Sequence, residues 1–114
     1  MNIQAFLEQL NTAADSISFT DTMSVIENNY DFTPCEFTNG TLTNEANQNN
    51  GSCKIFAFAK LNNISAELTL QCFGDYYRKD VLQHPEADDH QNIRNFINSG
   101  WSGITFNSTA LSAK

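Results

Sequence analysis

Apolar residues at the start of the chain recur every three or four positions: Ile3, Phe6, Leu7, Leu10 and Ala14. This spacing is typical of the buried face of an amphipathic helix. We therefore predict a first helix over about residues 2–14.

A second helix is predicted to begin at Thr20, whose hydroxyl oxygen can accept a hydrogen bond from the first helical turn. Its apolar stripe is formed by Met23, Ile26 and Tyr30. The helix is expected to end before Pro34, because the residue that precedes a proline avoids the helical conformation.

A change to strand pattern follows this second helix. Residues 35–44 are centred on Asn39-Gly40, a pair that readily adopts the positive φ angles of a type I′ turn. The sequence thus predicts a short β-hairpin. A hairpin is marginal alone and needs a further strand or other packing, and residues 103–106 are the candidate for that strand.

The sharpest contrast in the chain is a polar run that changes abruptly into an apolar segment. The run TNEANQNNGSCK covers residues 43–54, and IFAFAKL covers residues 55–61. Since IFAFAKL is apolar on both faces, its period alone does not separate helix from strand. Ser52 is a good N-cap, so we predict a buried helix over about residues 53–62.

Two more helices are predicted after it. One is capped by Ser65 and ends near His84-Pro85, and the other begins near Asp88 or Asp89. The apolar stripe of the first is Leu70, Phe73, Tyr77 and Val81, and that of the second is Ile93, Phe96, Ile97 and Trp101. The tail of residues 112–114 is expected to fray. Together these elements predict an α+β fold, a mainly helical single domain over residues 1–114 with a small antiparallel sheet.

Composition narrows the classes of function. Thirteen acidic residues against six basic ones give a net charge of −7, which opposes binding to nucleic acids and to anionic membranes. No segment approaches the length of about 20 apolar residues that a spanning helix needs. Three cysteines without a CxxC pair, and no signal-peptide pattern at the start, predict reduced thiols and a cytoplasmic location.

The amide-rich run is the first candidate for a binding site. A loop that enters a helix presents free backbone N–H groups, which suit an anionic ligand. The GxxxxGK[ST] spacing of a phosphate-binding loop is absent, and a solvated loop is the simpler alternative. The candidate ligand-binding residues in this run are Asn44, Glu45, Asn47, Gln48, Asn49, Ser52 and Lys54.

Tyr76, Arg78 and His90 are added to the candidate site because they could line a cleft beside the run. Cys53 near a helix start could serve as a nucleophile with a histidine as its base. The alternative is a packed, inert cysteine, and no catalytic residue is predicted. His90 lacks a further ligand one helical turn away, and a loop site through Glu86 or His84 is the remaining alternative. No metal and no cofactor is predicted.

Several segments taken together are similar to a known family. They are SFTDTMSVIENNYDFTP, NEANQNNGSCKIFAFAKL, CFGDYYRKDVLQHP and DHQNIRNFINSGWSGITF, in this order along the chain. Nearly the whole chain resembles the HopJ type III effector family. The resemblance implies a bacterial protein delivered into a host cell by type III secretion. It implies no settled enzymatic activity and no cofactor.

Two hypotheses follow. The first is an effector-like interaction protein, non-catalytic, with a host or bacterial protein as its partner. The second is a protein of the bacterial cytoplasm that binds a small ligand, or a small enzyme, with its site around residues 44–54. The sequence leaves both open, and also leaves open the oligomeric state.

Overall fold

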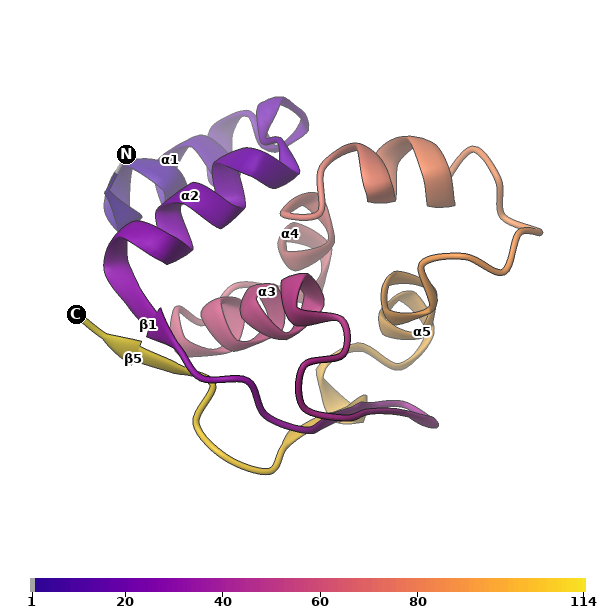
Figure 1. Ribbon diagram of the computed structural model, residues 1–114. Coiled ribbons are helices and arrows are strands. Elements are labelled where there is room, and N and C mark those ends of the chain that lie inside the picture. Colours follow the sequence, from indigo (N-terminus) through magenta and orange to yellow (C-terminus); the bar gives the residue numbers. More distant parts are fainter. Residues whose placement is uncertain (1) are drawn as a thin grey trace.

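Helix α3 (Asn50–Leu61) runs through the middle of the molecule in the computed structural model, which describes residues 2–114 (Figure 1). Its buried residues lie on all sides of the helix: Cys53, Ile55, Phe56, Ala57, Phe58 and Ala59. A helix that is apolar all round must be covered all round, so the predicted buried helix is confirmed. The predicted cap at Ser52 is wrong. Asn49 is the N-cap, and Ser52 lies in the first turn.

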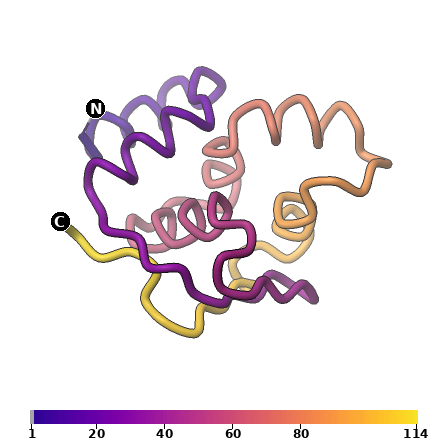
Figure 2. The backbone as a smooth tube through the Cα atoms, viewed as in Figure 1, coloured from indigo at the N-terminus to yellow at the C-terminus, as the bar shows by residue number. Residues whose placement is uncertain are grey.

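Helices α1 (Ile3–Thr12) and α2 (Phe19–Asn29) lie on one side of α3, and a short 3-10 turn, η1 (Ala14–Ser16), joins them (Figures 1 and 2). The predicted first helix is confirmed within two residues at each end. The predicted cap of the second helix at Thr20 is wrong, because Ser18 caps it. The Ser18 hydroxyl accepts from the Asp21 N–H at 3.0 Å, and the Asp21 carboxylate accepts from the Ser18 N–H at 3.1 Å. This reciprocal pair satisfies two backbone donors, where a single hydroxyl would satisfy one.

The predicted hairpin and its third strand are confirmed. Strands β2 (Phe37–Asn39), β3 (Leu42–Asn44) and β4 (Ile104–Phe106) form an antiparallel sheet in the order β3-β2-β4. The predicted turn type is wrong, because Asn39 pairs with Leu42 and so Gly40-Thr41 forms the centre of the turn. Gly40 has a φ of +63° whereas Thr41 does not have a positive φ, which is the pattern of a type II′ turn.

A second, two-stranded sheet was not expected from the sequence. Strand β1 (Tyr30–Phe32) pairs with β5 (Leu111–Ala113), and the Lys114 N–H donates to the Asn29 carbonyl at 3.1 Å. Tyr30 therefore belongs to a strand rather than to the preceding helix, and the tail predicted to fray is bonded to the body of the protein. Three-residue strands carry too little alternation to be recognised by period.

The predicted long helix after Ser65 is interrupted. Helix α4 (Ala66–Gln71) has the predicted Ser65 cap, but Gly74 then adopts a φ of +63° and a wide helical turn of π type, η2 (Tyr76–Val81), follows. At Gly74 the chain passes directly against the backbone of Ser18 and Phe19. The last helix, α5 (Gln91–Ser99), begins after His90, two or three residues later than predicted, and leads through η3 (Gly100–Gly103) into β4.

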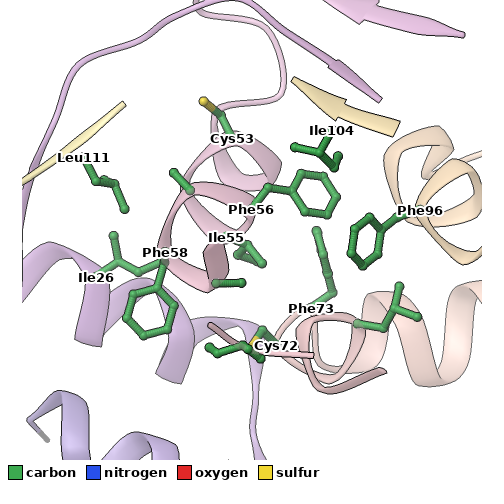
Figure 3. Packing of buried hydrophobic residues seen from close by; sticks show 14 of the residues in the cluster. Ile26, Cys53, Ile55, Phe56, Phe58, Cys72, Phe73, Phe96, Ile104 and Leu111 are labelled. Atoms are coloured by element: carbon green, nitrogen blue, oxygen red, sulfur yellow. The ribbon is translucent and has the colours of Figure 1, made fainter. Parts of the chain in front are cut away.

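Aromatic side chains fill the space between α3 and its neighbours (Figure 3). Phe56 is the centre of this aromatic core, and its ring lies 4.9–6.4 Å from those of Phe37, Phe73, Phe96 and Trp101. Ile97, predicted to share the buried face of α5, is 45% exposed. The α+β fold with its small antiparallel sheet is confirmed.

Candidate functional site

A cleft of about 540 Å³ lies where α3 and α5 begin. Asn49, Gly51 and Ser52 border it at the start of α3, and residues 90–93 border it at the start of α5. Phe19, Leu42, Phe73 and Tyr76 complete its lining from four other parts of the chain. We call this space the α3–α5 cleft. Its volume is within the range of small-molecule sites.

One wall of the α3–α5 cleft is aromatic. Phe19 and Tyr76 meet edge to face with centroids 5.0 Å apart, and the His90 ring lies 5.2 Å from that of Tyr76. Tyr76 remains 43% exposed, so part of its ring is presented to solvent. His90 is held from behind, because its Nε2 lies 3.1 Å from a carboxylate oxygen of Asp80. The π-type turn η2 carries both Tyr76 and Asp80 and thereby builds this wall.

Four asparagines, of which Asn49 alone is exposed, form the other wall of the cleft and the layer beneath it. Asn92 and Asn44 exchange side-chain hydrogen bonds at 3.0 and 3.1 Å, and Asn39 Nδ2 donates to the backbone carbonyl of Asn92 at 2.8 Å. Asn49 Nδ2 donates to Asn44 Oδ1 at 2.7 Å. We call these four residues the asparagine network. It joins the hairpin β2–β3 to the first turns of α3 and α5, and so fixes the two helix starts relative to each other.

The structure divides the ten predicted site residues into four groups, of which the two basic residues form the last. Asn49, Ser52, Tyr76 and His90 all line the α3–α5 cleft, whereas Asn44 is buried beneath it with 1% of its surface exposed. The exposed residues Glu45, Asn47 and Gln48 are not part of the lining. Sequence reasoning therefore placed four of its ten candidates on one cleft.

The two basic candidates point elsewhere. Lys54 Nζ lies 3.7 Å from Glu27 and 4.9 Å from the centre of the Phe32 ring. The Arg78 guanidinium donates to the carbonyl oxygens of Ala14 and Ile17 and to Gln71. Arg78 thus ties η1 to the turn after α4 and has a structural role.

Sequence reasoning missed seven members of the lining: Phe19, Leu42, Gly51, Phe73, Gln91, Asn92 and Ile93. Phe19 and Leu42 resemble ordinary core positions in the sequence, and their partial exposure depends on packing between distant segments. The positive φ of +49° at His90 and +52° at Asn49 marks both helix starts. Asparagine and histidine tolerate this conformation better than most residues, but the sequence alone does not show where they adopt it.

The thiols are structural. Burial raises the pKa of both Cys53 and Cys72 to about 12, and for Cys53 the neighbouring Cys35 adds to the effect. Cys53 is 1% exposed, and its sulfur points away from Phe56 towards the loop before β2 (Figure 3). No histidine is within hydrogen-bonding distance of it in the part of the chain that the structure describes. This packing argues against Cys53 as a nucleophile.

Alkylation of the native protein by iodoacetamide at pH 8 should therefore be slow. With a pKa of about 12, Cys53 and Cys72 hold almost no thiolate at this pH, and their rates should fall on the order of 1,000-fold below that of a free cysteine. Mass spectrometry of peptides from timed samples measures each rate, and the same protein in 6 M guanidinium is the control for full reactivity. A native Cys53 that reacts at the control rate would contradict this assignment.

Comparison with known proteins adds the family. The sequence profile of the HopJ type III effector protein family matches residues 3–111. This chain belongs to the HopJ family. The HopJ chain is also similar to a solved protein described as "Crystal structure of unknown function protein VPA0580", with 60% identity and a TM-score of 0.99 over 100% of this chain and 95% of the other. No curated protein matches it.

Within residues 2–114, no helix is long and apolar enough to cross a membrane. Across the same residues, no three His, Cys, Asp or Glu side chains come together in a way that could hold a metal ion.

Asn92→Ala in this HopJ chain should lower the free energy of unfolding by about 2–3 kcal/mol, because it leaves the buried Asn44 Nδ2 without an acceptor and removes one hydrogen bond each from Asn39 Nδ2 and Asn44 Oδ1. Chemical denaturation measures the loss. Asn98→Ala, on the exposed side of the same helix, is the matched control and should change stability by less than about 0.5 kcal/mol. Equal losses for both variants would show that the network contributes nothing beyond helix propensity.

Proposed function

We propose that this HopJ protein acts by binding a partner molecule in the α3–α5 cleft, and that it is not a catalyst. The single observation that carries the proposal is the cleft itself. In this cleft, aromatic side chains lie beside polar groups that have no hydrogen-bond partner in the part of the protein that the structure describes. These residues come from segments far apart in the sequence. Concave sites of this volume with a mixed lining are the usual form of a ligand pocket.

The lining supports binding over catalysis. Of the residues that border the α3–α5 cleft, only Tyr76 and His90 can titrate. His90 already faces Asp80 through Nε2, and Ser52 makes no hydrogen bond to a histidine among the described residues. An activated nucleophile needs a base within hydrogen-bonding reach, and the lining does not supply that pair.

Family membership supports an effector-like role for this binding. In this proposal the protein is made in the bacterial cytoplasm, is delivered into a host cell by type III secretion, and there holds a host ligand or the side chain of a host protein. Its net charge of −7 argues against nucleic acid as that partner.

The binding part of the proposal is tested by screening a fragment library with ¹⁵N-labelled protein. Binders should shift backbone amide resonances of Ser52, Tyr76 and Gln91 in the wild type. Ser52→Phe, which fills the cleft, should abolish these shifts. Ser24→Phe, at an exposed position of α2, should keep them. Binders that act equally on both variants would place the site elsewhere.

The delivery part needs a separate experiment. A translocation reporter fused to this chain should enter host cells from bacteria with an intact type III apparatus, and not from a strain that lacks its ATPase. Equal signals from the two strains would count against an effector role while leaving the cleft proposal intact.

A further inference from the structure

The α3–α5 cleft offers hydrogen-bonding groups of both kinds. Asn49 donates one N–H to Asn44, and Gln91 donates one N–H to the Asp88 carbonyl. The side-chain carbonyl oxygens of both residues, and the Ser52 hydroxyl, have no hydrogen-bond partner within residues 2–114. The backbone N–H groups of Gly51 and Gln91 belong to first helical turns, where no intrahelical acceptor exists. The polar wall therefore includes both hydrogen-bond acceptors and residues with free backbone donors.

Charged side chains do not contribute to this wall. Within residues 2–114, no Lys or Arg is part of the lining. Three basic groups that are close to lining residues in sequence are engaged elsewhere: Lys54 beside Glu27, Arg78 on backbone carbonyls, and Arg94 beside Asp89 at 2.7 Å. The helix starts favour negative charge, but Asp80 and Asp89 lie 3.1 and 3.9 Å from His90 and offset that preference. A neutral ligand fits this balance better than a phosphate or a cation.

The aromatic wall, on the opposite side of the cleft, determines which shape of ligand fits. Tyr76 is supported edge-on by Phe19 and flanked by His90, so its position is fixed while 43% of its surface remains open. Gly51 makes room for this support, since a Cβ at that position would lie 3.0 Å from the Phe19 ring. A partly exposed aromatic ring that is held in place stacks well against a flat apolar face of a ligand.

We propose that the α3–α5 cleft takes a neutral ligand rich in hydroxyl groups and with one flat apolar face, which is the chemistry of a sugar ring. The C–H face of the ring lies on Tyr76. Its hydroxyl groups, each both a donor and an acceptor, pair with the side chains of Asn49, Ser52 and Gln91. The volume of about 540 Å³ accommodates one or two such rings. This inference rests on the proposed binding function.

The test is a titration of the ¹⁵N-labelled protein with four probes: maltose, N-acetylglucosamine, uridine and inorganic phosphate. A neutral saccharide should shift the amides of Ser52, Tyr76 and Gln91 in a saturable way. Phosphate should leave them unchanged at equal ionic strength. Uridine as the tighter ligand, or phosphate as the only ligand, would overturn the assignment to a sugar.

Variants separate stacking from hydrogen bonding. Tyr76→Ala should weaken saccharide binding about 10-fold or more, and Tyr76→Phe, which keeps the ring, should retain it within about 2-fold. Asn49→Ala should weaken binding through the lost carbonyl. Leu82→Ala, at an exposed position just after η2, is the control and should bind as the wild type does.

The two proposals fail differently. If library fragments bind at Ser52 and Tyr76 but no saccharide does, the ligand class is wrong and the binding function stands. If neither fragments nor saccharides shift these resonances, both are wrong.

Discussion

Phe56→Ala is expected to lower the free energy of unfolding by about 3–5 kcal/mol. Phe56 is fully buried at the centre of the aromatic core and contacts the rings of Phe37, Phe73, Phe96 and Trp101. Those rings come from β2, from the turn after α4, from α5 and from η3, so truncation leaves a cavity that no single element can close by moving. Since domains are stable by about 5–15 kcal/mol, the variant should lose a large part of its stability.

Urea denaturation followed by circular dichroism measures this loss. Leu82→Ala is the control, because Leu82 is 53% exposed and should contribute less than about 0.5 kcal/mol. A loss below about 1.5 kcal/mol for Phe56→Ala would mean that the core collapses onto the vacated space, and the assignment of Phe56 as its centre would then be wrong.

Gly74→Ala is expected to destabilise the protein by about 3 kcal/mol or more. Gly74 has a φ of +63°, and a Cβ there would lie 2.6 Å from the backbone nitrogen of Phe19. The left-handed conformation alone costs an alanine about 1 kcal/mol. The rest arises because a backbone atom cannot move aside as the end of a flexible side chain can. The start of α2 would have to separate from η2, and Phe19 would move away from Tyr76.

Gly100→Ala separates these two costs. Gly100 also has a positive φ, +60°, with a ψ of −154° that glycine alone adopts readily, but an added Cβ would meet nothing within 4 Å. Its loss should be limited to the conformational part, about 2 kcal/mol. Heteronuclear NMR of the two variants should also show altered Phe19 and Tyr76 resonances only in Gly74→Ala. Equal losses of stability would remove the steric part of the explanation.

The sequence predicted the parts of the fold that depend on local pattern. The apolar stripe of α1, most of those of α2 and α5, and the all-round apolar character of α3 follow from residue spacing, with Tyr30 and Ile97 as the exceptions. The caps at Thr20 and Ser52 were wrong because several polar residues precede each helix, and the choice among them depends on tertiary contacts. The break at Gly74 was missed because it is imposed by the neighbouring backbone of Ser18 and Phe19.

The site was predictable to a smaller extent. The polar run that enters a buried helix led to Asn49 and Ser52, which line the α3–α5 cleft together with Tyr76 and His90. Lys54 and Arg78 lie outside this lining, because a basic side chain carries no local signal for the partner it will find. Phe19 and Leu42 could not be found, because their role arises only when segments distant in sequence meet.

The two sheets share a property that bears on how the protein is made. Strands β4 and β5 pair with β2 and β1, which precede them by more than half the chain. Neither sheet is therefore complete until residues 104–113 have left the ribosome. Until then the edges of β1 and β2 are open, and an open strand edge is a template for mispairing. Translation that stalls before residue 104 should thus yield a chain that depends on chaperones, although all its long helices have already been synthesised.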